Sequence, residues 1–294
     1  MPDLVIRPLV PGEEHLFAAL PTTGAAGRAL LGEEPAGYRP ELMWVALREG
    51  TVVARAAWWA GPEDETPVAL DWFDFTDFDA AVALLRTVPW RAEYSLHAPP
   101  GWRADPAAAR EVQTRLDAAE AAGLELLVER YRYEWTPECG LPSRPGRLAF
   151  RPEPDDARIL DVFREIHQDS LDAHARRATA ERGLDVAAQE DLDLLRSLPS
   201  PREWWRLAYT SEGALAGLVV PARNSASPIV AYVAVLPAHR GRGYSYDLLV
   251  EATHDLVAEG AEKIVAATDR TNFPMARAFA KAGYAVTQHR IDLV

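Results

Sequence analysis

The sequence predicts an α/β (α+β) protein made of two tandem domains of the same kind. Strand-like and helix-like patterns alternate along the 294 residues, and their order in the first half is repeated in the second. A Pro/Gly-rich stretch without hydrophobic periodicity separates the two halves. We therefore expect a first domain at 1–137, a linker at 138–146 and a second domain at 147–294.

The elements of the first half follow from local patterns, with apolar runs on either side of Gly50 predicting a hairpin. They are a strand from residue 4, a helix at 12–20, hairpin strands at 43–47 and 52–59, a strand at 68–75, a helix at 107–122 and a strand ending at 135. The second half begins and ends in the same way. Its elements are a strand from residue 148, helices at 159–166 and near 189–195, hairpin strands at 205–209 and 214–220, strands at 229–236 and 264–268, a helix from 272 and a strand ending at 293.

The most informative stretch runs from Ile229 to Val257. Residues 229–236 carry no charge and many β-branched side chains, which predicts an interior strand covered on both faces. Pro237 ends this strand. After a short basic loop, the apolar residues of the next segment fall on one side of a helix; these are Leu248, Leu249, Ala252, Leu256 and Val257.

The loop between this strand and helix is suited to binding phosphate. Gly241 and Gly243 allow several backbone N–H groups to point into one concavity, and the next helix adds the positive end of its dipole. Arg240 and Arg242 add positive charge. The loop lacks the Lys-Ser/Thr of a P-loop and the third glycine of a dinucleotide fingerprint, so those two classes of nucleotide site are excluded.

The loop resembles the acyl-CoA pyrophosphate loop of the GCN5-related N-acetyltransferases, with Arg240, Gly243 and Ser245 at the positions of the family pattern. A block from Asn272 to Tyr284 is similar to the last helix of that family. The resemblance implies two tandem domains, each with a mixed, mostly antiparallel central sheet that contains a splayed strand pair and is flanked by helices. It also implies acetyl-CoA as co-substrate, with no metal, bound by Val233, Ala234, Val235, Arg240, Gly241, Arg242, Gly243, Tyr244, Ser245, Asn272 and Phe279. Asn272 is equally expected as a helix N-cap, and the two roles are compatible.

The usual acid and base of the family are missing from their usual places. Phe279 stands where many members have a tyrosine, and residues 225–236 contain no carboxylate. The candidate catalytic residues are Asp269, at the end of the strand beside the splay, and Tyr232, for which a packed core ring is the alternative. His167 and His174 would share a helix face if that helix were continuous, and a solvated face is the alternative there.

The first half lacks the phosphate loop. After the strand at 68–75 the chain continues as Thr76-Asp77-Phe78-Asp79, without glycine or arginine, and its acidic residues would repel a pyrophosphate. The first domain is therefore expected to be a degenerate copy, and an unrelated α/β domain is the alternative.

Composition limits the partners. The net charge of −13 disfavours nucleic acid and anionic membranes, and no run of about 18 apolar residues exists for a membrane span. Because the N-terminus lacks the apolar core of a signal peptide and Cys139 is the single cysteine, we expect a cytoplasmic protein without a cysteine metal cluster.

Together these observations predict an N-acetyltransferase, monomeric or homodimeric, that acts on a small-molecule amine. A non-catalytic acyl-CoA-binding regulatory or scaffold protein is one alternative, and a transferase of a longer acyl or an aminoacyl group is another.

Overall fold

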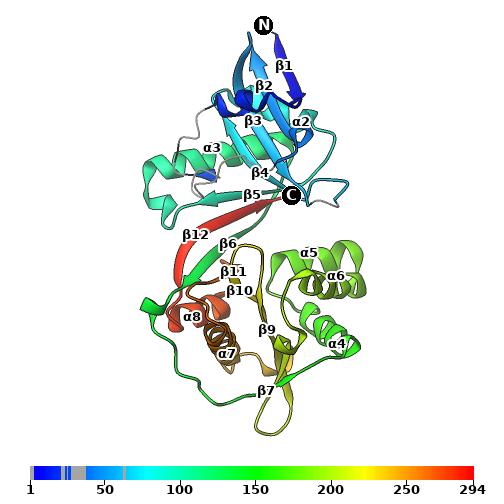
Figure 1. The fold of residues 1–294 in the computed structure, drawn as a ribbon, viewed down its shortest axis with the longest axis vertical. Coiled ribbons are helices and arrows are strands. Elements are labelled where there is room, and N and C mark those ends of the chain that lie inside the picture. Colours follow the sequence, from blue (N-terminus) through cyan, green and yellow to red (C-terminus); the bar gives the residue numbers. More distant parts are fainter. Residues whose placement is uncertain (1–2, 21–23, 25, 28–37, 62–63) are drawn as a thin grey trace. The chain divides into compact units, whose positions relative to one another are not determined.

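The computed structural model describes residues 3–294 apart from 21–23, 25, 28–37 and 62–63, and the chain forms two compact units (Figure 1). The first unit is Met1–Arg130 with Gln288–Val294, and the second is Tyr131–Thr287. The chain passes from one unit to the other within β6 (Leu126–Trp135) and again within β12 (Ala285–Leu293). The end of the chain thus belongs to the first unit, while the domain boundaries at 137 and 147 stay a prediction.

The first unit contains a mixed sheet in the order β1-β2-β3-β4-β5-β12. Neighbouring strands are antiparallel, except that β4 and β5 are parallel. The elements before β6 are β1 Leu4–Pro8, α1 Glu14–Ala18, η2 Pro40–Leu42, β2 Met43–Arg48, β3 Thr51–Trp59, β4 Ala69–Phe75, α2 Phe78–Thr87, β5 Glu93–Ala98, η3 Trp102–Ala104 and α3 Pro106–Ala122. Helix α2 packs on β2, β3 and β4, and α3 packs on α2 and β5.

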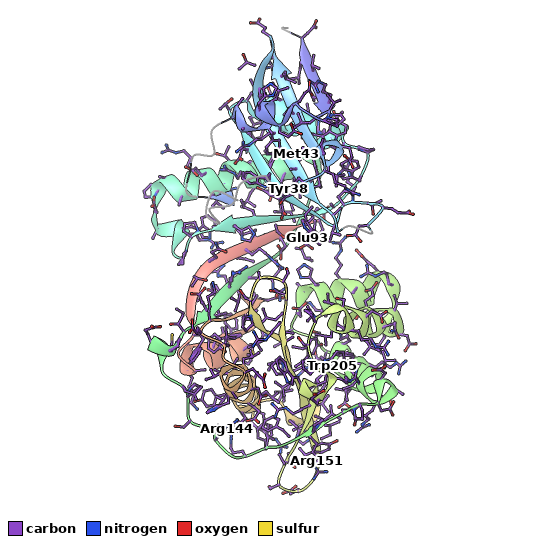
Figure 2. All side chains as sticks on the ribbon, in the orientation of Figure 1. Tyr38, Met43, Glu93, Arg144, Arg151 and Trp205 are labelled. Atoms are coloured by element: carbon purple, nitrogen blue, oxygen red, sulfur yellow. The ribbon has the colours of Figure 1, made fainter. Side chains whose placement is uncertain are left out.

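The predicted hairpin of the first half is confirmed as β2 and β3. Its turn contains Glu49 and Gly50, which both have positive φ, at 49° and 77°. Glycine tolerates this backbone conformation without steric cost, which is why the chain reverses there. Residue Met43 on β2 is buried in the core of the unit (Figure 2).

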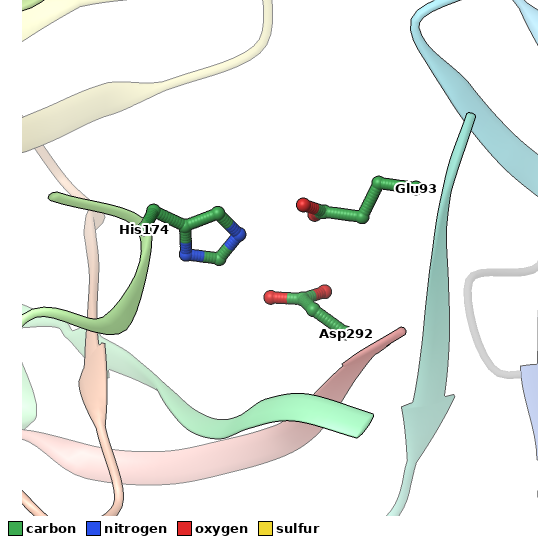
Figure 3. Close-up of side chains that lie close together, drawn as sticks. All are labelled: Glu93, His174 and Asp292. Atoms are coloured by element: carbon green, nitrogen blue, oxygen red, sulfur yellow. The ribbon is translucent and has the colours of Figure 1, made fainter. Parts of the chain in front are cut away.

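The last strand completes the first unit. Residues His289 to Leu293 of β12 pair antiparallel with β5, and Ser95 donates a hydrogen bond to the Asp292 carboxylate at 2.9 Å. Arg290 donates a second one at 3.1 Å from its Nε. Figure 3 shows the side chains of Asp292 and Glu93, which come from β12 and from the first residue of β5. The sequence signal for a final strand therefore marks an element that closes the sheet of the other half of the chain.

The partly buried carboxylate of Glu129 links η3, β6 and β12. Glu129 accepts two hydrogen bonds from Arg103, at 2.8 and 2.7 Å, and lies 2.6 Å from Nδ1 of His289. Burial raises the pKa of Glu129, but the hydrogen bonds from His289 and Arg103 outweigh it and hold the pKa well below its ordinary value of 4.5. The ionised form is therefore stabilised in the folded protein.

This arrangement predicts a pH-dependent contribution to stability. Because the folded pKa of Glu129 lies below the unfolded one, its contribution is fully present above pH 4.5 and is lost as the pH falls below that value. We expect Glu129→Gln to lower the free energy of unfolding by about 1–3 kcal/mol at pH 7, a typical value for hydrogen bonds to a charged group. Urea denaturation at pH 7 and pH 3 checks this. A difference between variant and wild type that stays constant over this range would contradict the linkage.

The second unit has the strand order β6-β11-β10-β9-β8-β7. Strands β10 and β11 are parallel, whereas β9–β10, β8–β9 and β7–β8 are antiparallel. Its elements between β6 and β12 are η4 Pro137–Cys139, β7 Ala149–Pro152, α4 Asp156–His167, α5 Ala173–Arg182, α6 Leu184–Ser197, η5 Arg202–Trp204, β8 Arg206–Tyr209, β9 Leu215–Arg223, β10 Pro228–Val235, η6 Pro237–His239, α7 Tyr244–Ala258, β11 Ile264–Asp269 and α8 Phe273–Lys281. The prediction of mixed, mostly antiparallel sheets flanked by helices is confirmed.

Helices cover both faces of the second sheet. Leu218 and Val220 of β9 pack with α4 and α6, whereas Val219 between them packs with Leu248 of α7. This alternation follows from the two-residue period of a strand. Trp205, just before β8, is 2% exposed on the α4 and α6 side (Figure 2). Among the described residues, no helix combines the length and apolar character needed to cross a bilayer.

Candidate active site

The end of β10 presents backbone N–H groups at an open edge. Strand β10 pairs with β9 along its length, but the described residues of β11 are in register with it only at Ile229. The N–H of Leu236 bonds to Ala216 of β9, so by the alternation of an antiparallel ladder the N–H groups of Val233 and Val235 point to the opposite side. The carbonyl of Val235 confirms this direction because it accepts a bond from Arg240.

This geometry bears on two expectations for the central strand, its burial and the direction of its amides. Every residue of β10 is partly buried rather than fully buried, although helices lie on both faces of the sheet. The pairing with β11 is limited to Ile229, so β11 does not cover the far end of β10 as a strand neighbour. Of the three amides predicted to meet the cofactor, Ala234 faces β9 instead of the open edge. A β-bulge between Val230 and Tyr232 sets this alternation.

The glycine loop follows directly. Gly241 and Gly243 have φ of 77° and 76°, a conformation that a side chain would strain, and residues 241–243 are exposed. Gly243 is the N-cap of α7, and no side chain of the described residues caps this helix. The first-turn amides of Tyr244 and Ser245 therefore lie at an uncapped, positively polarised helix end.

Arg240, predicted to bind phosphate, is held by protein groups. Its Nη1 donates to the backbone carbonyl of Asp169 at 2.6 Å and to the Asp169 carboxylate at 2.8 Å, and its Nε donates to Val235 at 3.3 Å. The Asp169 side chain is 79% exposed. An anion bound at this loop would compete with the solvent-exposed carboxylate of Asp169 for the guanidinium group of Arg240. The side chain of Arg242 is exposed.

Asp269 lies at the end of β11 and is 1% exposed. Its Oδ2 accepts a hydrogen bond of 2.7 Å from the amide of Ala173, the first residue of α5. A carboxylate at this position stabilises the helix N-terminus through its free amides and its dipole. The predicted catalytic carboxylate therefore has a structural role at the start of α5.

Tyr232 belongs to a cluster of titratable residues on the α4 and α6 side of the sheet. Burial raises the pKa of its hydroxyl well above 10, and Asp191 and Asp172 raise it further. Asp191 accepts a hydrogen bond from Tyr232 and lies 2.8 Å from Nε2 of His167. The Tyr232 ring packs edge-on against Phe163 with centroids 5.1 Å apart, so the core role considered for this residue is also present.

Three further predicted features occupy defined places. Asn272 is the N-cap of α8 and accepts a bond from Met275 N at 3.3 Å, and Phe279 stacks on Tyr133 with ring centroids 4.2 Å apart. His167 ends α4 and His174 lies in α5, so the two histidines do not share a continuous helix.

The corresponding loop of the first unit differs in chemistry. Asp77 caps α2 by accepting a 3.0 Å bond from Ala80 N, and it pairs with Arg48 at 2.5 Å. Hydrogen bonds from Arg48 and then Ala80 lower the pKa of Asp77, so its carboxylate is ionised at neutral pH. This helix end therefore already has an anionic cap. That the first half has lost a phosphate loop stays a prediction.

Several residues that contact this region were not among the predicted site residues. Arg147 contacts the backbone of the glycine loop, Asp169 holds Arg240, and Asp191 joins Tyr232 to His167. Asp191 lies on the acidic side of a predicted helix, and Asp169 lies in the titratable stretch between His167 and His174. Arg147 had no such signal.

In the second unit an open strand edge thus leads to a glycine loop and a helix N-terminus. Comparison with known families shows that residues 163–284 match the acetyltransferase (GNAT) family. These residues form a GNAT-family domain, which indicates acyl transfer as its chemistry.

Solved structures extend the likeness to the fold of the whole chain. A GCN5-related N-acetyltransferase from Sphaerobacter thermophilus is 17% identical with a TM-score of 0.57, covering 100% of this chain and 96% of its own. A tandem GNAT protein from the clavulanic acid biosynthesis pathway is 14% identical with a TM-score of 0.52, covering 99% and 98%. A search of curated proteins gives no significant match. The chain therefore has the two-domain GNAT fold.

Proposed function

We propose that the second unit transfers an acetyl group from acetyl-CoA to a primary amine of a small molecule, in the cytoplasm. The observation that carries this proposal is the open edge of β10 at Val233 and Val235, directly followed by the exposed loop at Gly241 and Gly243. In this proposal the loop and the α7 N-terminus hold the diphosphate, and the Val233 and Val235 amides hold the arm and the thioester oxygen.

The residues present fit this co-substrate. The loop amides are exposed, the helix end has no side-chain cap among the described residues, and glycines stand where the backbone needs positive φ. Bound acetyl-CoA would supply an acetyl group that is already activated as a thioester. The chain's own part is to orient it, to stabilise the developing oxyanion and to accept a proton from the amine.

Tyr232 is better suited to donate a hydrogen bond than a proton. Its pKa well above 10 keeps it protonated at neutral pH. A thiol has a pKa of about 8.5, so proton transfer from Tyr232 to a departing thiolate would be unfavourable. We assign Tyr232 a hydrogen-bonding role beside Val233.

Two carboxylates are candidates for the proton acceptor. Asp269 is 1% exposed and bonded to the Ala173 amide, whereas the side chain of Asp191 is 27% exposed and contacts both Tyr232 and His167. A proton acceptor must be reachable by the amine, so we favour Asp191. The variant Asp191→Asn tests the role of Asp191 as proton acceptor. Asp193→Asn is its control, because Asp193 is an exposed aspartate on the same helix.

The decisive experiment combines calorimetry of acetyl-CoA binding with free-thiol release against a panel of amines. Binding with thiol release for some amine supports the proposal, and Arg240→Ala should weaken binding about tenfold by removing a charge-assisted contact. Binding without release for any amine would favour a non-catalytic acyl-CoA-binding protein. Faster release from a larger acyl-CoA would favour a different acyl group. Absence of binding would reject all three.

The contact between Asp169 and Arg240 makes a prediction of opposite sign. Asp169→Asn should strengthen acetyl-CoA binding about two- to fivefold, because it removes an exposed ion pair that competes for Arg240, and such pairs are worth up to about 1 kcal/mol. Calorimetry at low salt measures the change. Asp193→Asn, which removes the same charge elsewhere in the unit, should leave the affinity unchanged. Weaker binding in Asp169→Asn would mean that Asp169 helps to place Arg240 for the ligand.

A further inference from the structure

Arg147 contacts the glycine loop and donates hydrogen bonds to its backbone carbonyls. It follows the predicted linker segment, 95 residues before the loop in sequence. Its Nη1 donates to the carbonyl of Arg242 at 3.0 Å, and its Nη2 donates to the carbonyl of Gly243 at 3.2 Å. Two consecutive carbonyls of the loop therefore point toward one guanidinium group.

The direction of these carbonyls fixes the direction of two amides. All described peptide bonds are trans, so the carbonyl of one residue and the N–H of the next point in opposite directions. With the carbonyls of Arg242 and Gly243 turned to Arg147, the N–H groups of Gly243 and Tyr244 point away from it. These two amides belong to the loop and to the first turn of α7, where the anion is expected to bind.

A buried carboxylate holds Arg147 in this position. Its Nε donates to Oδ1 of Asp247 at 3.0 Å, and its Nη2 forms a short contact with Oδ2. Asp247 lies in the first turn of α7 and its side chain is 2% exposed. The guanidinium also lies 5.2 Å from the ring of Tyr244. The fork geometry of arginine serves both the carboxylate and the two carbonyls, which a lysine ammonium cannot reproduce.

We infer that Arg147 is a positioning residue for the diphosphate site: it holds two peptide planes so that the Gly243 and Tyr244 amides face the ligand. This inference rests on the proposed function for the identity of the ligand, a nucleotide diphosphate such as that of coenzyme A. The positioning itself rests on the contacts of Arg147 alone.

The chain contains a matched control. Arg144 (Figure 2) lies three residues before Arg147, and its side chain has similar exposure, 52% against 45%. Its Nε bonds to Glu251 in the middle of α7 at 2.8 Å. A substitution at Arg144 removes one positive charge that contacts the same helix, α7, but the Arg144 side chain bonds to Glu251 and not to a carbonyl of the glycine loop.

The test is calorimetric titration of the full chain with acetyl-CoA. Arg147→Ala should weaken binding about 10- to 100-fold, as expected when binding groups are displaced by about 1 Å. Arg147→Lys should lose most of this affinity, and Arg144→Ala should stay within about twofold of wild type. With S-acetylpantetheine, which has no diphosphate, the KM of any thiol release should be equal in Arg147→Ala and wild type. Wild-type affinity in Arg147→Lys would overturn the inference, because charge alone would then suffice.

Two controls keep the result interpretable. Arg147→Ala leaves Asp247 as a buried charge, so the double variant Arg147→Ala/Asp247→Asn should regain stability but not affinity. If the wild-type protein does not bind acetyl-CoA, the proposed function fails. The effect of Arg147 on the two loop amides is then tested separately by NMR spectra of the backbone amides. The Gly243 and Tyr244 amide resonances should shift in Arg147→Ala but not in Arg144→Ala. Unchanged resonances would overturn the positioning role.

Discussion

Replacing Asp74 with alanine should destabilise the first unit by about 3–5 kcal/mol, the cost of leaving a buried charge without its partner. Asp74 lies on β4 and its Oδ2 accepts bonds from Nε and Nη2 of Arg55, at 3.1 and 2.9 Å. Its Oδ1 accepts a bond of 3.0 Å from Arg115. All three residues are buried, at 1% exposure for Arg55, 8% for Asp74 and 9% for Arg115. The substitution leaves two buried guanidinium groups without this carboxylate.

The surroundings of Arg55 explain why its guanidinium group cannot easily find another partner when the Asp74 carboxylate is removed. Its Nη1 donates to the carbonyl of Phe17 at 2.6 Å, and its guanidinium carbon lies 4.9 and 5.2 Å from the rings of Phe17 and Trp72. The Arg55 side chain is thus held against α1 and Trp72, and it is 1% exposed.

Denaturant titration with hydrogen exchange of the β3 and β4 amides measures this prediction and locates it in the first unit. Asp79→Ala is the control, because Asp79 is exposed in the first turn of α2 and should cost less than about 1 kcal/mol. Asp74→Asn should be destabilised too, since the amide keeps the shape but not the charge. A loss below about 1 kcal/mol in Asp74→Ala would mean that water reaches the arginines.

Elements with strong local signals were predictable from the sequence. The strand expected at 229–236 is β10 at Pro228–Val235, and the turn expected at Gly50 lies between β2 and β3. In these segments hydrophobic periodicity and glycine conformation depend on a few consecutive residues, so the local sequence is enough to predict the strand or the turn. The loop at 241–243 belongs to the same class.

Breaks without glycine or proline were not predictable. The chain between His167 and Ala173 has no such signal, yet α4 ends and α5 begins there. The break depends on Asp172, which caps α5 by accepting a 3.0 Å bond from Ala175, and on Asp269, which binds the Ala173 amide. One of these two partners is 96 residues away in the chain, and a local pattern cannot reveal it.

The candidate site shows the same division between local and distant information. Arg240, Gly241 and Gly243 form a local motif, whereas Asp169 and Arg147 reach it from 71 and 95 or more residues away. Partial burial of β10 was also outside the reach of the sequence. An apolar strand composition does not reveal how far the neighbouring strand stays in register, and here the register with β11 is limited to Ile229.

Gly217→Ala should damage both the second unit and its proposed ligand site. Gly217 lies on β9 opposite Val235, and a Cβ at this position would be 2.4 Å from the carbonyl oxygen of Ala234 and 3.1 Å from Cδ1 of Leu248. A backbone oxygen cannot rotate away as a flexible side chain can, so β9 and β10 must move apart. Such overpacking typically costs about 1–3 kcal/mol.

The displacement of β10 would move the groups that are proposed to bind the co-substrate. Val235, next to Ala234, turns its amide to the open edge and its carbonyl to Arg240. A shift of about 1 Å at Ala234 would therefore move the proposed pantetheine contacts and Arg240 together, and acetyl-CoA affinity should fall by tenfold or more.

Denaturant titration and calorimetry on the same preparation separate the two effects of Gly217→Ala. Gly213→Ala is the matched control, because Gly213 lies in the turn just before β9 and has open space around it but a φ of 82°. It should cost about 1–2 kcal/mol through backbone strain and leave acetyl-CoA binding unchanged. If Gly217→Ala loses stability but binds acetyl-CoA like wild type, the ligand is not held at the end of β10. In that case the proposed site, with the open edge at Val233 and Val235, would be wrong even though the family assignment stands.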